Sequence, residues 1–230
     1  MTGDRRLLAL VPYAAAGVIH LVALAAAVDG LGTVTKVLLM PTLALALLVL
    51  AGEHRGHWTW GTAIALVLAW AGDLALNVPR DVWFLVGLAA FLLAHLVYVG
   101  VFWPFTRRSG LRRRPWAAIP YTAWWVVLLA VLAPGLGDLV VPVAIYGLVL
   151  GASATVAVGV NRTVAWGAGI FLVSDSLLAL HRYADWFAVP QPDVWVMATY
   201  IAGQGLIVLG LVRAGRARPA RRLRPSDARS

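Results

Sequence analysis

Five ionisable side chains stand inside otherwise apolar stretches of this sequence: His20, Lys36, Asp73, His95 and Asp175. Placing a charged group at the centre of a membrane span costs about 2.5–3.5 kcal/mol on insertion scales, so each of these residues needs a compensating role. Two of them are carboxylic acids, and on one substrate such a pair can act as general acid and general base. The pattern therefore predicts either acid–base chemistry within the membrane or buried polar contacts between helices.

The two aspartates carry the strongest signal. Asp73 follows Gly72 near the end of its apolar stretch, where it either lines a cavity or reaches water at the interface. Gly72 permits a close helix neighbour, which favours the cavity. Asp175 lies between Ser174 and Ser176, about 9 Å from the end of its stretch at 1.5 Å per residue. A hydrogen bond between helices would also explain Asp175, but a carboxyl group at this depth favours a functional role.

His95 belongs to a polar and aromatic stripe with Phe91, Tyr98 and Phe102. The spacing i, i+4, i+7, i+11 places these side chains on one face of a helix. His95 is either a proton donor or carboxylate partner, or a structural histidine satisfied by a neighbouring helix. The sequence leaves both interpretations open.

The remaining polar residues are less specific. Tyr200 and Gln204 are spaced i, i+4 and share a helix face, and a hydrogen bond between helices is the simpler explanation for Gln204. Lys36 lies near the end of its stretch, where extension of its ammonium to the lipid headgroups is the default and contact with a phosphate is the alternative. His20 is interpreted as structural.

Composition and the apolar stretches predict that transmembrane helices position these residues. Hydrophobic residues make up 61% of the 230 residues and charged residues only 13%, against about 25% charged in soluble domains. Apolar stretches long enough to cross a bilayer recur at 7–28, 34–51, 58–77, 82–105, 116–133, 139–159, 163–181 and 193–213. We therefore predict an all-α membrane protein with about eight transmembrane helices over residues 1–213. Residues 214–230 are rich in Arg and Pro and predict a basic disordered tail.

The net charge of +9 reflects membrane orientation, and we expect no nucleic-acid partner. Arginines concentrate on one side of the predicted spans: Arg5, Arg6, Arg55, Arg107, Arg108, Arg112, Arg113, Arg114, Arg162 and those from Arg213 onward. The other side has only Arg80 and Arg182. Because positive charge stays in the cytoplasm, the pattern predicts that both termini are cytoplasmic. The chain is then a multi-pass protein of the inner (plasma) membrane whose environment is the lipid bilayer.

Several kinds of chemistry are excluded or disfavoured. The chain has no cysteine, so it forms no disulfide or thiolate metal site. A zinc site needs three or more well-placed ligands, and the only candidates, His20, His95 and His181, fall on three different spans. No serine-hydrolase elbow, zinc-protease motif or phosphate-binding loop is present. We therefore expect neither a metal nor a cofactor.

Three segments form a recognisable series along the chain: Gly72-Asp73, the run GLAAFLLAHLVY at 87–98, and the run GAGIFLVSDSLLAL at 167–180. In this order they resemble the YhhN / TMEM86 family of multi-spanning lysoplasmalogenases. Lys36 and the pair Tyr200 and Gln204 also fit the family pattern, and the resemblance covers nearly the whole chain. It implies a hydrolase that cleaves the vinyl-ether bond of lysoplasmalogens, releasing a fatty aldehyde and a glycerophospho-base. The partner of such an enzyme is a lysophospholipid.

Vinyl-ether hydrolysis needs an acid to protonate the alkene carbon, and one carboxylic acid with one carboxylate suffices in principle, as in glycosidic cleavage through a similar cation. Our hypothesis gives catalysis to Asp73 and Asp175, in either order, with His95 as their partner. It gives substrate or water contacts to the polar side chains around them: Lys36, Tyr98, Ser174, Tyr200 and Gln204. His95 falls about 20 Å from the outer face, so one compact site requires tilted helices, shifted span ends or a long cavity.

Two other classes of function fit the same composition. A proton-coupled transporter or lipid-binding membrane protein also uses intramembrane Asp and His, and a transport pathway would open alternately to both faces. A structural scaffold whose basic tail binds anionic lipid would leave Asp73 and Asp175 unexplained. A closed-ended cavity with convergent carboxyl groups favours the enzyme.

Overall fold

The computed structural model describes residues 7–109 and 115–217, and this part of the chain is all-helical with no β-strand. Eight long helices succeed one another: α2 (Val11–Ala25), α3 (Asp29–Ala51), α4 (His57–Leu76), α5 (Asp81–Ser109), α6 (Ile119–Leu136), α7 (Val140–Ala157), α8 (Arg162–Tyr183) and α9 (Pro192–Arg216). Each overlaps one predicted span. The predicted all-α membrane fold is therefore confirmed.

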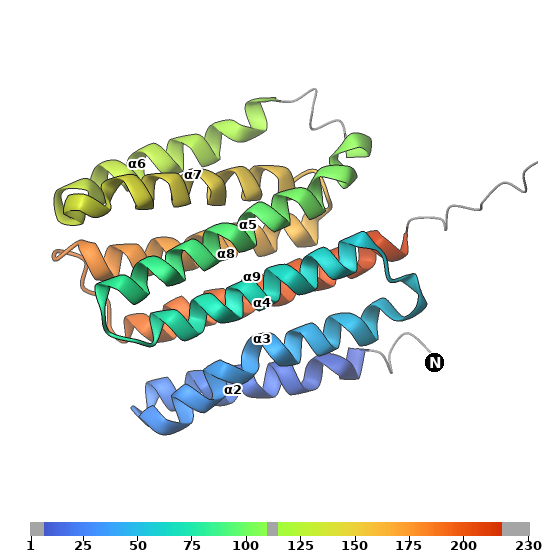
Figure 1. Cartoon of the computed structure of the whole chain (residues 1–230), viewed down its shortest axis with the longest axis horizontal. Helices are drawn as coiled ribbons and strands as arrows, with labels where there is room; N and C mark the ends of the chain where they lie inside the picture. The colour runs from blue at the N-terminus through green and yellow to red at the C-terminus, as the bar shows by residue number, and fades with distance from the viewer. Residues whose placement is uncertain (1–6, 110–114, 218–230) are drawn as a thin grey trace, which may run out of the picture.

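Within the described residues, seven helical stretches are long and apolar enough to cross a membrane. The longest of them, Trp116–Val158, contains both α6 and α7, which are separated by a short 3-10 turn at Gly137–Leu139. The two helices turn back there and pack side by side (Figure 1). Counted as separate crossings, they bring the bundle to the predicted eight.

Sequential helices run antiparallel and stack in pairs across the bundle (Figure 1). The pair α2 and α3 forms one edge and the pair α6 and α7 the other (Figure 1), and between them α4 packs against α5 and α8 against α9. The start of α2 and the end of α9 lie at the same end, which we call the terminal end. The opposite end, formed by the turns 26–28, 77–80, 137–139 and 184–191, is called the distal end.

Local sequence signals define where α8 and α9 begin and end. Asn161 caps α8 by accepting a hydrogen bond from the Val164 N–H at 3.0 Å, and its amide donates to the Gly210 carbonyl of α9 at 2.8 Å. Helix α9 begins at Pro192, which is suited to a first helical position. Arg213 and Arg216 in its last turn complement the negative end of the helix dipole. One asparagine therefore both starts α8 and ties it to α9.

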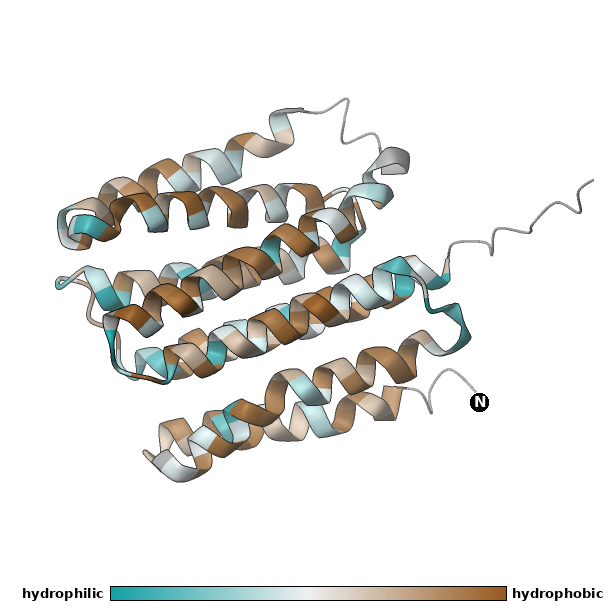
Figure 2. Cartoon of the chain, in the orientation of Figure 1, coloured by the Kyte–Doolittle hydropathy of each residue, from teal (hydrophilic) through white to brown (hydrophobic). Residues whose placement is uncertain are grey.

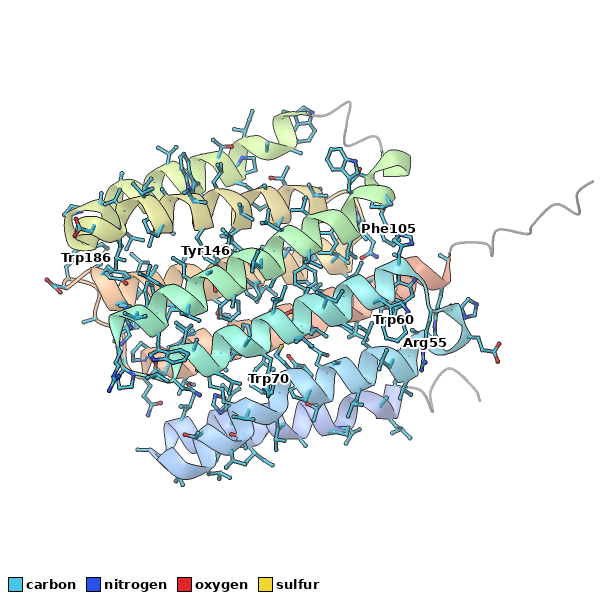
Figure 3. All side chains as sticks on the ribbon, viewed as in Figure 1. Arg55, Trp60, Trp70, Phe105, Tyr146 and Trp186 are labelled. Carbon is cyan, nitrogen blue, oxygen red and sulfur yellow. The ribbon has the colours of Figure 1, made fainter. Side chains whose placement is uncertain are left out.

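The outward surface of the bundle is apolar, as a lipid environment requires. Large hydrophobic side chains such as Val67, Leu93 and Val127 are exposed along the middle of their helices. Hydrophilic residues gather mainly at the two ends (Figure 2). Trp60 lies near the terminal end and Trp186 at the distal end, as expected of aromatic residues at the two interfaces (Figure 3).

Two glycine pairs allow neighbouring helices to approach at backbone distance. A Cβ added at Gly72 would lie 2.7 Å from the Phe91 ring and 3.3 Å from the Gly87 carbonyl oxygen, across the α4–α5 contact. At Gly203 a Cβ would lie 3.0 Å from the Gly167 carbonyl oxygen, across the α8–α9 contact. The close neighbour expected beside Gly72 is therefore present, and these pairs position the helices that carry both aspartates.

The predicted boundary of the transmembrane domain falls inside α9, which continues to Arg216. Residues 218–230 of the predicted tail lie outside the described residues, as do Arg5, Arg6, Arg112, Arg113 and Arg114. The basic disordered tail stays a prediction.

Candidate active site

A cavity of about 750 Å³ lies in the distal half of the bundle. Every one of the eight long helices contributes to its lining: His20 of α2, Lys36 of α3, Asp73 of α4, Phe91 of α5, Trp124 of α6, Tyr146 of α7, Asp175 of α8 and Tyr200 of α9. Its volume falls in the range of roughly 300–1,000 Å³ typical of small-molecule sites. Both aspartates chosen from the sequence therefore face one shared space.

Asp73 is held at the cavity wall by a tyrosine from another helix. It lies in the last turn of α4 and only 4% of its surface is exposed. The Tyr200 hydroxyl of α9 donates a hydrogen bond to its Oδ2 at 2.7 Å. The structure thus joins two residues that the sequence separates by 127 positions.

Asp175 is held in the same manner between a second pair of helices. The Tyr146 hydroxyl of α7 donates a hydrogen bond to Asp175 Oδ2. Figure 3 shows Tyr146 extending from α7 toward the interior of the bundle. Each carboxyl group therefore has one phenol donor, and both groups line the same cavity.

The two serines beside Asp175 make different contacts. The Ser174 hydroxyl donates to the Val196 carbonyl at 2.8 Å, and Ser174 also lines the cavity. Ser176 donates to the Leu172 carbonyl and accepts from the Trp124 indole N–H at 2.9 Å, which joins α8 to α6. Ser174 is therefore available to a ligand, whereas Ser176 connects helices.

Lys36 brings a positive charge to the Asp73 side of the cavity. Its ammonium donates a hydrogen bond to Asn77 Oδ1 at 2.7 Å. Asn77 follows Asp73 by four residues, so the two side chains project from the same face of α4, one turn apart. Lys36 therefore reaches the cavity wall, which favours a ligand contact over extension to the headgroups alone.

The structure places the three remaining predicted residues farther from the distal end, outside the cavity lining. His95, Tyr98 and Gln204 are not among the described residues that line the cavity. Tyr98 donates to Gln204 Oε1 at 2.8 Å, and His95 Nδ1 lies 3.3 Å from Ser153 Oγ. Helix α5 runs away from the distal end, so His95 lies about 20 Å along it.

His95 packs against aromatic residues that adjoin the cavity on the side away from the distal end. The His95 ring packs edge-on against Phe171 at 4.8 Å between centroids and against Tyr146 at 6.2 Å. Phe91, one turn from His95 toward the distal end, packs edge-on against Tyr200 and lines the cavity. His95 thus touches the tyrosine that holds Asp175 rather than the carboxyl group itself.

Tyr146 and Asn77 are site residues that the sequence analysis missed. A tyrosine inside a membrane span needs a hydrogen-bond partner for its hydroxyl, and Tyr146 lies six residues into the otherwise apolar start of α7. That requirement is a signal that would have identified it. Asn77 has no such signal, because asparagine is common where a helix ends.

Comparisons with known proteins identify the family of the chain. The model of the YhhN family matches residues 31–211. The chain is 33% identical over 185 residues to lysoplasmalogenase TMEM86B of Homo sapiens, covering 76% of this chain and 74% of the relative. It is 32% identical over 174 residues to lysoplasmalogenase TMEM86B of Rattus norvegicus, covering 76% and 71%.

A bacterial relative extends the likeness. The chain is 34% identical over 173 residues to a lysoplasmalogenase of Mycobacterium bovis, covering 71% of this chain and 64% of that protein. No solved structure matches the chain. The matched segment, residues 31–211, contains both aspartates and both of the tyrosines that hold them. The chain belongs to the YhhN family.

Proposed function

We propose that this protein is a lysoplasmalogenase, which hydrolyses the vinyl-ether bond of 1-alkenyl lysophospholipids to a fatty aldehyde and a glycerophospho-base. The observation that carries the proposal is a single intramembrane cavity in which two buried carboxyl groups, each held by a tyrosine, lie beside a lysine. Relatives named lysoplasmalogenase match this chain over most of its length, which supports the same activity here.

The chemical character of the cavity changes across the bundle in the order that such a lipid requires. Lys36 of α3 lies at one edge and suits a phosphate. Asp73 and Asp175 follow in the middle layers, where the vinyl ether would lie. At the far edge α6 and α7 contribute apolar side chains that suit the alkenyl chain: Leu128, Leu129, Leu132 and Val143. The cavity thus pairs each part of the lipid with a matching surface.

The reaction needs one proton donor and one water molecule. The acid protonates the alkene carbon remote from the ether oxygen, which places positive charge on the adjacent carbon and the oxygen. Water attacks that carbon and loses a proton to the carboxylate, and the hemiacetal then collapses to the aldehyde and the glycerol hydroxyl. Two carboxyl groups that share an apolar site favour keeping one proton between them, so Asp73 and Asp175 together supply an acid and a carboxylate.

The surrounding residues have positioning roles in this scheme. Tyr200 and Tyr146 fix the orientation of the two carboxyl groups through their hydroxyl donors. Ser174 offers its oxygen lone pairs to the attacking water. His95, with Tyr98 and Gln204, fixes the aromatic layer beneath and acts on Asp175 through Tyr146.

Replacing Tyr146 with phenylalanine is expected to lower kcat about 10-fold or more, because Asp175 loses a hydrogen bond of the charge-assisted kind. Steady-state aldehyde release by the purified variant measures the effect. Tyr121→Phe is the matched control, since Tyr121 is half-buried on α6 and does not line the cavity. Unchanged turnover in a folded Tyr146→Phe protein would remove Tyr146 from the mechanism.

Replacing Lys36 with methionine is expected to raise KM about 10-fold while leaving kcat nearly unchanged, because a contact to the phosphate stabilises the bound substrate and the transition state equally. The same variant should show no such increase with 1-alkenylglycerol, which has no phosphate. An equal rise in KM for both substrates would show that Lys36 acts on the cavity's shape and not on a phosphate.

The experiment that tests the proposed activity compares three lysolipids that differ only in the bond at the first glycerol carbon. Purified protein in detergent is incubated with 1-alkenyl, 1-alkyl and 1-acyl lysophosphoethanolamine. Aldehyde is expected from the alkenyl lipid alone, because only an alkene can be protonated to the stabilised cation. A folded protein that releases no aldehyde from the alkenyl lipid would refute the proposal.

The cavity's position favours an enzyme over a transporter. Its lining residues come mainly from the distal half of the bundle and reach just past the middle at Trp124 and Trp125 of α6 and Leu150 of α7, so among the described residues the lining stops short of the terminal end. A transport pathway needs access to both faces. If reconstituted protein moved lysolipid between leaflets without cleaving it, the transporter would be the better account.

We also propose that both termini are cytoplasmic, in the inner (plasma) membrane. The described residues support that orientation by the distribution of positive charge. Two arginines, Arg80 and Arg182, lie at the distal end, whereas six lie at the terminal end: Arg55, Arg107, Arg108, Arg162, Arg213 and Arg216. The chain lacks cysteine, so single cysteines at Glu53 and Asp138 can report it. A membrane-impermeant maleimide added to intact cells should label position 138 only, and labelling of position 53 alone would reverse the topology.

A further inference from the structure

One nitrogen of the His20 imidazole has no hydrogen-bond partner. His20 Nδ1 lies 3.0 Å from the Gly32 carbonyl oxygen and 3.0 Å from Thr35 Oγ1. A carbonyl oxygen can only accept, and the Thr35 hydroxyl already donates to the Leu31 carbonyl at 2.7 Å. In the neutral imidazole Nδ1 therefore carries the proton, and Nε2 presents a lone pair that can only accept.

Nε2 is buried and unsatisfied among the described residues, although His20 lines the cavity. Only 2% of the side chain is exposed. Buried polar atoms without partners are rare, because the cost of desolvation is then uncompensated. A ligand group in the cavity that donates a hydrogen bond would remove this cost. The partner must carry an O–H or N–H, since a phosphate oxygen or an ester has no proton to give.

The location of His20 indicates which part of a lysolipid it meets. Gly32, which binds the imidazole, precedes Lys36 by four residues and shares its face of α3. Lys36 in turn contacts Asn77, one turn from Asp73. His20 therefore lies beside the group that suits the phosphate, within the same cavity as the carboxyl groups. On a 1-alkenyl lysolipid, the donor between the phosphate-bearing carbon and the vinyl-ether carbon is the sn-2 hydroxyl.

We propose that His20 Nε2 accepts a hydrogen bond from the sn-2 hydroxyl, and that His20 thereby selects lysolipids over lipids acylated at this position. This inference rests on the proposed vinyl-ether hydrolysis. An sn-2 ester offers no proton to Nε2 and leaves that nitrogen buried and unpaired. A site built to bind a hydroxyl rejects an analogue that lacks it, because its own polar group then stays unsatisfied.

The test compares kcat/KM for 1-alkenyl lysophosphoethanolamine and for its analogue with hydrogen in place of the sn-2 hydroxyl. Wild-type protein is expected to prefer the hydroxylated lipid by about 10- to 100-fold. His20→Asn keeps an amide N–H for Gly32 and removes the Nε2 acceptor, so its preference should fall to nearly one. Tyr13→Phe is the matched control on the same helix: it loses the hydrogen bond to the Ile201 carbonyl at 2.7 Å and should keep the wild-type preference.

The outcomes separate the inference from the proposed function. Equal kcat/KM of wild-type protein for the two lipids would overturn the inference and leave the hydrolase standing, without any variant being needed. A His20→Asn protein that loses activity on both lipids equally, with the preference retained, would show that His20 is purely structural. Absence of aldehyde from both lipids would instead refute the hydrolase on which the inference rests.

Discussion

Replacing either Asp175 or Asp73 with asparagine is expected to lower kcat for aldehyde release by about 100-fold or more. General acid–base groups contribute roughly 10²- to 10⁴-fold, and the amide of asparagine neither donates a proton to carbon nor carries the negative charge that stabilises the cation. The substitution keeps the shape of the side chain, and its amide oxygen still accepts from Tyr146 or Tyr200. Single-turnover release of aldehyde by purified variants measures the loss.

The control for these two variants is Asp138→Asn, which changes an exposed carboxyl group in the turn between α6 and α7. It should leave turnover unchanged. Thermal unfolding in detergent must show that each variant is folded. Retention of wild-type turnover by both Asp73→Asn and Asp175→Asn would sink the two-carboxylate assignment.

Replacing Gly203 with alanine is expected to lower the stability of the bundle, because the α8–α9 contact leaves no room for a methyl group. The added Cβ would lie 3.0 Å from both the Gly167 carbonyl oxygen and the Phe171 backbone nitrogen, and backbone atoms of a packed helix cannot move aside as a flexible side chain can. Overpacking of this kind costs about 1–3 kcal/mol and occasionally more. Because α8 and α9 carry Asp175 and Tyr200, their separation should also reduce aldehyde release.

Gly169→Ala is the matched control on α8, where an added Cβ meets nothing within 4 Å. It should match wild type in its unfolding temperature or exceed it slightly, since alanine is the better helix former. The midpoint of thermal unfolding, followed by tryptophan fluorescence in detergent, measures both variants. Equal midpoints for Gly203→Ala and Gly169→Ala would show that the α8–α9 contact is not as close as described.

Much of the fold follows from sequence because the membrane leaves few solutions. Backbone groups in lipid must be satisfied within the segment, so long apolar stretches become helices and their number gives the bundle. The same argument identified Asp73 and Asp175, whose types are too unfavourable in lipid to be incidental. Gly72 added a local reason to expect a close neighbour, and the contact with Gly87 and Phe91 confirms it.

The shape of the cavity could not be predicted in this way. It depends on which side chains from different helices meet: the phenol that binds Asp175 comes from Tyr146 on the preceding helix, and the phenol that binds Asp73 comes from Tyr200, 127 positions away. Depth along a helix did carry information. The sequence placed His95 deeper along its helix than the two aspartates, and the structure agrees: His95 lies outside the cavity lining and packs against Phe171 and Tyr146.

The central claim is that this cavity protonates the vinyl-ether carbon of a lysolipid and adds water to the resulting cation. The most direct measurement is mass spectrometry of both products after purified wild-type protein acts on 1-alkenyl lysophosphoethanolamine in D₂O. We predict a fatty aldehyde with a single deuterium on the carbon next to the carbonyl, and a glycerophospho-base with no carbon-bound deuterium. Folded protein that yields no aldehyde, or aldehyde without that deuterium, would contradict the account.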